Sequence, residues 1–421
     1  MSQTAVIGAQ WGDEGKGKIV DYLGGEVNIR FAGGSNAGHT LKVDDDKYVI
    51  HAAPSGIIRS GTHNLIGRYV ALDLEALIPE LDIAHKHQSK VMVDMMARIV
   101  LPIHKQLDAA REQACGKDKI GTTNRGVSTC YEDFATRRGV VFSDMATSDS
   151  FVKALKYMGY YDERCALLRY YGVEPWSVDR LVEWTRSNNF SWLVSNFGGN
   201  TRRSLNASIS LGRRVVFEGA QGVMLFLHSG TYPFATSCFG GPDGIQVCFG
   251  HVELDRILGV TKAYATRVGA GPFPTEMSRE MTDLIRTKGN EFGSTTGRER
   301  RCGWLDLVAL RYACRYAGLT ELVVTKLDVL SGFDNLNVCI AYSEDELGPE
   351  IWSAEASYLS TVRPIYKNLA GWKEDITSCS RARDLPEAAR QYLDFMSSQV
   401  GLPIKLVSVG PSRRQTIRYP F

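Results

Sequence analysis

The stretch TAVIGAQWGDEGKGKIVDYL, Thr4 to Leu23, predicts a strand, a glycine-rich loop and a helix in direct succession. The apolar run stops at Gly8, and the segment KGKIVDYL that follows the loop has a helical pattern. Glycines between a strand and a helix let backbone N–H groups converge on an anion, and the start of the helix adds a favourable dipole. From Gly12 the loop has the G-x-x-x-x-G-K spacing of a phosphate-binding loop. We therefore expect a phosphate site here, with Lys16 and Lys18 adding positive charge.

This loop departs from the usual phosphate-binding pattern in two ways. Ile19 stands where a Ser or Thr hydroxyl would hold magnesium, and Asp13 and Glu14 place carboxylates inside the loop. A carboxylate beside a phosphate is costly unless a divalent cation lies between them or the carboxylate transfers a proton, and both tasks suit Asp13. The alternative is a tight turn with surface acids, since short glycine motifs also match by chance.

Other apolar runs in the chain also end in polar, glycine-rich loops. They are VNIRFA at 27–32, RRVVFEGAQG at 213–222, ELVVTKLDVLSG at 321–332 and IKLVSVGPS at 404–412. Helical patterns lie between them, at 149–158, 176–187, 304–318 and 385–399. This alternation predicts an α/β fold with a central, mostly parallel β-sheet, resembling the phosphate-loop NTPases, and with functional loops beyond the carboxyl ends of the strands.

The domain organisation follows from composition along the chain. Residues 145–213 hold more Trp, Tyr and Arg and fewer glycine loops, which indicates a helical insertion. We find no Pro- or Ser-rich linker and no internal repeat, so residues 1–421 are expected to form a single large domain.

Bulk composition restricts the class of protein. The 421 residues are 44% hydrophobic and 23% charged, with a net charge of +2, as in an ordinary globular protein without a field that favours nucleic acid or an anionic membrane. The nine cysteines form no C-x-x-C pair, which indicates reduced thiols in the cytoplasm rather than disulfides or a zinc site. We see no signal peptide, and no apolar run approaches the roughly 20 residues of a membrane helix.

A second polar loop, GGSNAGHT at 33–40, follows the predicted strand at 27–32 and contains Asn36 and His39. Alone, His39 reads as an ordinary surface histidine. At the same predicted sheet edge as Asp13, however, it can act as a general acid near neutral pH. An acid and a base on neighbouring loops suit a reaction in which one atom loses a proton and another gains one.

A basic loop, STTGRERRCGW at 294–304, carries Arg298, Arg300 and Arg301 behind two threonines and a glycine. Guanidinium groups bind carboxylates and phosphates through two parallel hydrogen bonds. In a nearly neutral protein, this loop predicts a site for an acidic ligand, and the alternative of a nucleic-acid patch lacks a surrounding basic field. The loop IGTTNRG at 120–126 has the form of a further anion site, whereas Arg137 and Arg138 on a predicted helix could simply be solvated.

The segment TKLD at 325–328 resembles the box with which GTP-binding proteins read guanine. In that box a carboxylate accepts hydrogen bonds from N1–H and N2–H of the base. Asp328 would have this role here, although a Lys-x-Asp segment at the end of a strand is a common pattern.

Taken together, the motifs of this chain resemble the adenylosuccinate synthetase family. The resemblance runs through QWGDEGKGKIVD, NAGHT, PSGI, EGAQG, GTYPFATS, KAYATRVGAGPFPTE, GNEFGSTTGR, RCGWLDLVALR, TKLDVL and VGPSRRQTI, in that order. It implies a single-domain α/β enzyme that works as a homodimer. It also implies a ligase that joins L-aspartate to C6 of IMP with GTP and Mg²⁺ and releases GDP and phosphate, in purine nucleotide biosynthesis.

The resemblance assigns the chemistry to two residues. Asp13 matches the general base that removes the N1 proton, so that O6 of the purine attacks the γ-phosphorus of GTP. His39 matches the general acid that stabilises O6, and the aspartate amine then displaces the 6-phosphoryl group. Asp13 and the Gly38 carbonyl match the magnesium ligands, which would explain the missing hydroxyl at Ile19.

The resemblance also implies a set of ligand-binding residues, grouped by loop. The phosphate loop supplies Gly12, Glu14, Gly15, Lys16, Gly17 and Lys18. The purine nucleotide side comprises Asn36, Thr123, Gln221 and Thr236, with Arg137 donated to the 5′-phosphate by the other subunit. Ala37, Thr40 and Arg125 are further expected ligand-binding residues. The aspartate loop comprises Thr295, Thr296, Gly297, Arg298 and Arg300, of which Arg300 also approaches the γ-phosphate. The guanine pocket comprises Lys326, Leu327, Asp328, Ser408, Val409 and Gly410.

Several positions depart from the family pattern, mostly on the purine side. They are Asn124, Ser128, Thr129, Phe226, His228, the shortened stretch 236–250 and Glu299. Phage relatives use dGMP in place of IMP and can use ATP as donor, so dGMP and ATP are the alternative substrates. This chain keeps Asp13, which some phage enzymes replace by serine, and Asp328 favours a guanine donor.

An alternative of another class is a GTP-binding switch or scaffold without ligase activity. The phosphate loop and the TKLD segment are common to both classes. Ile19 argues against a GTP-binding switch, because such proteins need a Ser or Thr hydroxyl at that position to coordinate magnesium.

Overall fold

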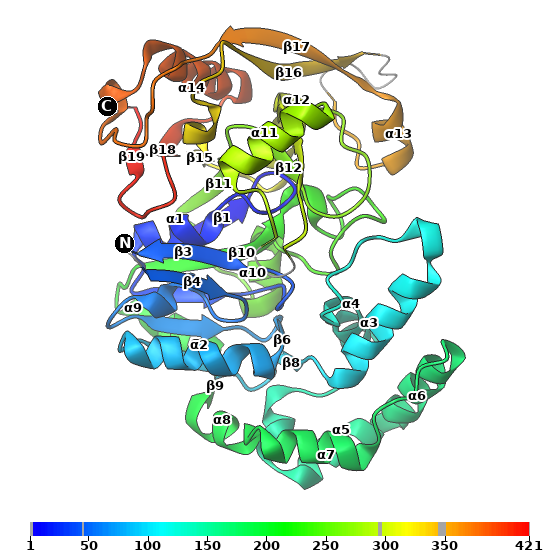
Figure 1. Cartoon of the computed structure of the whole chain (residues 1–421). Helices are drawn as coiled ribbons and strands as arrows, with labels where there is room; N and C mark the ends of the chain where they lie inside the picture. Colours follow the sequence, from blue (N-terminus) through cyan, green and yellow to red (C-terminus); the bar gives the residue numbers. More distant parts are fainter. Residues whose placement is uncertain (1–2, 44–45, 294–296, 344–350, 421) are drawn as a thin grey trace.

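A computed structural model describes residues 3–43, 46–293, 297–343 and 351–420. A ten-stranded sheet forms its centre, and the strand predicted at the start of the chain, β1 (Gln3–Gly8), lies inside it between β11 (Arg256–Lys262) and β10 (Val215–Gly222) (Figure 1). The order is β19 (Thr416–Arg418), β18 (Ile404–Ser408), β15 (Glu321–Thr325), β11, β1, β10, β2 (Val27–Arg30), β5 (His63–Ile66), β7 (Lys90–Asp94) and β9 (Gly198–Gly199).

The pairings in this sheet are parallel except that between β18 and β19, which is antiparallel. The predicted α/β class with a mostly parallel sheet is therefore confirmed. The carboxyl ends of β1, β2, β10, β15 and β18 consequently face the same side of the molecule, and the loops that leave them can meet there.

The alternation of side chains along β1 explains how both faces of the sheet are covered. Val6 joins a small core with Ile19 and Val20 of α1 (Lys16–Leu23), whereas Ala5 and Ile7 point into the large core on the other face. Successive strand residues point to opposite faces, so an almost continuously apolar strand signals burial on both sides.

The helices predicted from periodicity are present, with shifted ends. They are α5 (Ser148–Lys156), α7 (Val178–Ser187), α12 (Leu307–Tyr316) and α14 (Glu387–Val400). The segment predicted as a helical insertion, 145–213, also contains α6 (Tyr160–Tyr170), α8 (Phe190–Phe197) and α9 (Thr201–Ser210), and α5 to α8 gather at one end of the molecule (Figure 1). Its last part returns to the sheet, because β9 pairs with β7.

Further elements frame the functional loops. They are the hairpin β3 (His39–Val43) and β4 (Asp46–Ile50), α2 (Leu74–Lys86), α3 (Pro102–Ala114), α4 (Val127–Ala135), α10 (Pro242–Phe249), α11 (Arg279–Gly289), β12 (Ala265–Arg267) paired with β13 (Arg301–Gly303), and β16 (Asn335–Ser343) paired with β17 (Arg363–Ala370). All nine cysteines carry free thiols. Within the described ranges, we find no helix with the length and apolar character needed to traverse a lipid bilayer.

Candidate active site

A cavity of about 980 Å³ opens where the functional loops meet, which is large enough for a nucleotide and a second ligand. Loops that follow β1, β2, β10, β15 and β18 all contribute to its wall. It brings together most of the residues named from the sequence: Gly12, Asp13, Glu14, Gly15, Lys16, Gly17, Lys18, Asn36, Ala37, Gly38, His39, Thr40, Thr123, Gln221, Thr236, Arg298, Arg300, Lys326, Asp328, Ser408 and Gly410.

A few of the expected residues lie elsewhere. Leu327 and Val409 are fully buried in the core, and Arg125 and Gly297 do not line the cavity. Arg137 is exposed just beyond the end of α4. Thr295 and Thr296 lie outside the described residues.

Glu14, one of the two unexpected acids of the phosphate loop, shapes the loop from within. Its buried carboxylate accepts hydrogen bonds from the backbone N–H groups of Gln10 (3.1 Å) and Gly12 (2.9 Å) and forms an ion pair with Lys16 Nζ at 2.6 Å. A Cβ at Gly8 or Gly222 would come within 2.5 Å of this carboxylate, so glycine is required at both positions. The Glu14 carboxylate therefore holds the turn through the N–H groups of the loop and Lys16.

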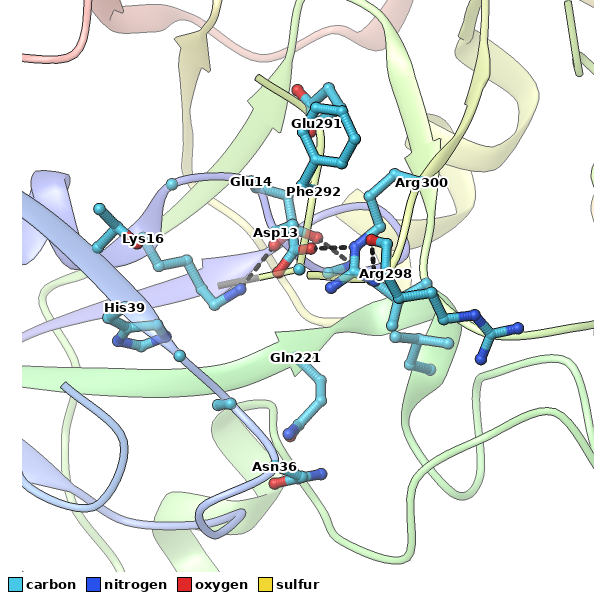
Figure 2. Close-up of a pocket in the computed structure, with 18 of the residues that line it drawn as sticks. Asp13, Glu14, Lys16, Asn36, His39, Gln221, Glu291, Phe292, Arg298 and Arg300 are labelled. Atoms are coloured by element: carbon cyan, nitrogen blue, oxygen red, sulfur yellow. Dashed lines mark hydrogen bonds and ion pairs between the residues drawn. The ribbon is translucent and has the colours of Figure 1, made fainter. Parts of the chain in front are cut away.

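Asp13, in contrast, points into the cavity. Its backbone has a φ of 59°, in the left-handed region that non-glycine residues rarely adopt, and 35% of its side chain is exposed. Arg300 Nε lies 2.7 Å from the Asp13 carboxylate (Figure 2). Burial opposes ionisation, but the charges of Arg300, Lys262 and Lys16 outweigh it and hold the pKa of Asp13 below its ordinary value. The carboxylate is thus available in its ionised form.

His39 lines the cavity and joins a buried hydrogen-bonded group behind it. Its Nδ1 contacts the Glu218 carboxylate, which also accepts hydrogen bonds from the Ser55 hydroxyl (2.7 Å) and the Ser55 backbone N–H (2.6 Å). Arg30 Nη1 lies 3.8 Å from the same carboxylate. Burial, together with the charges of Arg30 and Lys16, lowers the pKa of His39 against the opposing effect of Glu218. The neutral imidazole is therefore favoured in the free protein, and its Nδ1 faces the Glu218 carboxylate.

The part of the cavity expected to take the purine nucleotide contains amide and hydroxyl groups. Figure 2 shows Lys16 and His39 on one side of Asp13, Arg298 and Arg300 on the other, and Asn36 with Gln221 beyond them. Gln221 also has a left-handed backbone, with a φ of 52°, and its Oε1 lies 3.5 Å from the thiol of Cys238. These groups can donate and accept hydrogen bonds around a heterocyclic base.

The opposite end of the cavity contains the TKLD segment. Lys326, with a φ of 61°, donates its ammonium to the carbonyl of Gly289 and lies 3.7 Å from Glu291. Burial raises the pKa of Asp328, and the charges of Lys326 and Lys18 oppose this rise. Behind this end, Lys262 and Glu291 form a buried ion pair of 2.7 Å.

Several residues that shape the site were not identified from the sequence. All five are buried: Glu218, Ser55 and Arg30 contact His39, Glu291 lies beside Lys326, and Lys262 forms an ion pair with Glu291. A signal existed for Glu218, since an ionisable residue inside the apolar run VVFEG needs a buried partner. The motifs PSGI and GNEFG contain Ser55 and Glu291, but nothing local indicated their partners.

The oxygen ligands that the cavity offers fit a magnesium ion held jointly by the protein and by phosphate. Within the described ranges, no three His, Cys, Asp or Glu side chains cluster as a metal cage would require. Magnesium needs only one or two protein carboxylates when phosphate oxygens and water supply the rest. The Asp13 carboxylate meets that need, whereas Glu14 is fully occupied inside the loop.

Comparison with known proteins places the whole chain in one group. The family model described as adenylosuccinate synthetase matches residues 5–417. Adenylosuccinate synthetases of Alkaliphilus metalliredigens and Syntrophotalea carbinolica are 40% and 42% identical, covering 99% of this chain and 99% and 98% of the relatives.

Two solved structures match the fold. The fully ligated adenylosuccinate synthetase from Plasmodium falciparum superposes with a TM-score of 0.93 at 31% identity over 100% of both chains. The cyanophage S-2L succinoaminodeoxyadenylate synthetase, bound to dGMP and dATP, has a TM-score of 0.63 at 18% identity over 100% of this chain and 96% of its own. The second likeness supports the fold alone.

Proposed function

The chain belongs to the adenylosuccinate synthetase family, and from this membership we infer that it joins L-aspartate to C6 of IMP. It is a ligase that forms a C–N bond, uses GTP as co-substrate with Mg²⁺, and acts in purine nucleotide biosynthesis. The observation that carries this function is the convergence of Asp13, His39 and Arg300 on one cavity that also contains the guanine-reading segment.

Asp13 is proposed to remove the N1 proton of the purine, so that negative charge develops on O6. Arg300 keeps the carboxylate ionised in the free protein through the 2.7 Å contact. When the carboxylate of the aspartate substrate attracts this guanidinium, the pKa of Asp13 rises and the carboxylate becomes a stronger base. O6 then attacks the γ-phosphorus of GTP, and GDP leaves.

His39 is proposed to stabilise O6 and to supply a proton. Since Glu218 holds Nδ1, the other ring nitrogen is left for the cavity. The negative charge of the triphosphate favours the protonated imidazole, which offsets the effect of burial. The amine of aspartate, positioned by Arg298 and Arg300, attacks C6 and displaces phosphate.

When bound, magnesium would neutralise charge on the transferring phosphoryl group. The Asp13 carboxylate and the Gly38 carbonyl would hold it together with phosphate oxygens. Among the remaining loop residues, Gly15, Lys16 and Gly17 would bind the phosphates through N–H groups and one ammonium, whereas the N–H of Gly12 is donated to Glu14.

The assembly is proposed to be a cytoplasmic homodimer of single-domain subunits. Arg137 has a left-handed φ of 62° and projects from the surface after α4. An exposed guanidinium held by an ordered turn suits delivery to the 5′-phosphate of the nucleotide in a partner subunit.

The test is aspartate-dependent phosphate release from GTP with IMP, magnesium and L-aspartate. We expect release with IMP, and its absence with every nucleotide would overturn the proposal. Release with dGMP alone would instead select the phage-type substrate, and equal rates with ATP would contradict a guanine-specific donor site. The switch alternative would gain if Asp13→Asn kept full cellular function while binding GTP.

A further inference from the structure

The ammonium of Lys18 lies away from the position expected of it. Lys18 is the lysine of the G-x-x-x-x-G-K spacing, which in phosphate loops reaches the β- and γ-phosphates. Here Nζ donates to three oxygens at the end of β18 and in the loop that follows it: Ser408 Oγ at 2.5 Å, the Gly410 carbonyl at 2.6 Å and the Gln415 carbonyl at 2.9 Å. An ammonium has three protons, so its capacity to donate is used up by this loop.

This loop, residues 409–415, forms part of the cavity wall. Ser408, Gly410 and Pro411 line the cavity beside Lys18 and Asp328. The loop is closed by the backbone hydrogen bond from Val409 N to the Gln415 carbonyl at 3.0 Å, and this carbonyl is one of the three acceptors of Lys18. Lys18 therefore fixes the inner side of the loop that faces the base pocket.

Helix α1 holds the same loop at a second point, outside the cavity. Asp21, three residues after Lys18 and on the same side of the helix, accepts hydrogen bonds from Nε and Nη2 of Arg413, both at 2.6 Å. Arg413 does not line the cavity. Lys18 thus holds the loop on the cavity side, next to the base pocket, and Asp21 holds it on the outer side.

Lys18 also acts on Asp328 through its charge. Burial raises the pKa of the Asp328 carboxyl, and the positive charges of Lys326 and Lys18 counter that effect. An ionised carboxylate is the form that accepts two N–H groups of a guanine base. Lys16, by comparison, lines the cavity near the catalytic pair, since its charge acts on both Asp13 and His39.

We propose that Lys18 is a positioning residue for the base of the nucleoside triphosphate, and that Lys16 alone is the phosphate lysine of this loop. This inference rests on the proposed function, because it names how that same donor site selects a 6-oxo-2-aminopurine. It assigns the second lysine of the motif to the far end of the ligand, away from the transferred phosphoryl group.

The experiment compares Lys18→Met with Lys16→Met and Arg413→Met in the full-length protein. For Lys18→Met we expect the KM for GTP to rise about tenfold or more, because charge-assisted hydrogen bonds are lost. The ratio of kcat/KM for GTP over ATP should fall by a similar factor, with kcat at saturating GTP within about threefold of wild type. Lys16→Met should instead lower kcat, and Lys18→Arg should restore most of the GTP preference.

Two results would overturn the proposal. A fall in kcat for Lys18→Met with unchanged KM and unchanged GTP preference would place Lys18 on the phosphates. An equal loss of GTP preference in Arg413→Met would show that loosening the loop from either side has the same effect, so Lys18 would have no specific role.

Binding separates this inference from the proposed reaction. Calorimetry with GDP and ADP measures base preference without turnover, and we expect Lys18→Met to lose affinity for GDP but not for ADP. If Lys18→Met does not fold, Ser408→Ala removes one of the three acceptors and should weaken GDP binding a few-fold with an unchanged melting temperature. Unaltered GDP affinity in a folded Ser408→Ala or Lys18→Met protein would overturn the assignment. A wild-type protein that binds GDP selectively without releasing phosphate would count against the ligase function only.

Discussion

Replacing Glu218 by glutamine should remove the proton-donating capacity of His39 while preserving the shape of the site. Glu218 accepts hydrogen bonds from Ser55 N and Ser55 Oγ, at 2.6 Å and 2.7 Å, as well as contacting His39 Nδ1. A glutamine has one carbonyl oxygen, which the fixed Ser55 N–H retains. Its NH₂ group then faces His39, so Nδ1 must accept a hydrogen bond and the imidazolium loses its acceptor.

The expected loss follows from this one contact. A hydrogen bond between charged groups contributes about 1.5–3 kcal/mol, and about 1.4 kcal/mol corresponds to tenfold in rate, so kcat should fall by roughly 10- to 100-fold. Arg30, only 1% exposed and 3.8 Å from the Glu218 carboxylate, would keep its charge without that counter-ion and would further disfavour the imidazolium. We therefore expect a value near the upper end of this range.

The assay is phosphate release at saturating IMP, GTP and aspartate, together with exchange of the β,γ-bridging oxygen of GTP without aspartate, which isolates the phosphoryl step. Glu80→Gln is the matched control, because this buried carboxylate accepts backbone N–H groups of Ala52 and Ala53 and does not touch His39. It should lower the melting temperature and leave kcat nearly unchanged. If Glu218→Gln keeps both rates within about threefold of wild type, the role given to His39 is wrong.

Four other outcomes are expected. Asp13→Asn should lower kcat by about 100-fold or more at every pH, as for loss of a general base. A loss of kcat of only about tenfold in the phosphate assay would contradict that role. Arg300→Leu should raise the KM for aspartate about 10- to 100-fold in saturation kinetics, and unaltered saturation would show that the guanidinium does not bind the substrate. A mixture of Arg137→Leu and Asp13→Asn proteins should recover about a quarter of the wild-type rate, because half of the dimers are mixed and each has one intact site; no recovery would place Arg137 in its own subunit. Burial lowers the pKa of Lys18 to about 7, with Lys326 acting in the same direction and Asp328 opposing it. Above pH 7 the neutral amine has only two protons for its three acceptors, so the KM for GTP should rise with pH in wild type. The KM should not change with pH in Lys18→Arg.

The loops of the site could be predicted because each follows an apolar run. In a parallel sheet the carboxyl ends of the strands share an edge, so GDEGKGK, GGSNAGHT and TKLD had to lie near one another once the strands were identified. The sequence could not show which neighbour each side chain takes. His39 and Glu218 are 179 positions apart, and Asp13 and Arg300 are 287 apart. Such pairs depend on strand order and register, which local patterns do not encode.

The inward orientation of Leu327 and Val409 illustrates the same limit. Both stand inside functional loops, next to cavity-lining Asp328 and Gly410, and both are fully buried. A motif specifies a segment, whereas the side-chain direction of each member depends on the turn that the segment adopts. Lys18 shows this limit most clearly. The motif predicts a phosphate contact, whereas in the structure its ammonium donates hydrogen bonds to three oxygens of residues about 390 positions away.

The two acids of the phosphate loop also account for its need of a cation. Glu14 neutralises Lys16 at 2.6 Å, and Lys18 is committed to the loop at 409–415, so neither ammonium offers unopposed charge to a ligand. Backbone N–H groups alone meet only part of the charge of a triphosphate. A carboxylate at Asp13 would then repel the γ-phosphate unless a divalent cation lies between them. In the proposed mechanism, Asp13 therefore cannot remove the purine proton beside a phosphoryl donor without the ion that it would help to hold, which ties proton removal and phosphoryl transfer to a single side chain.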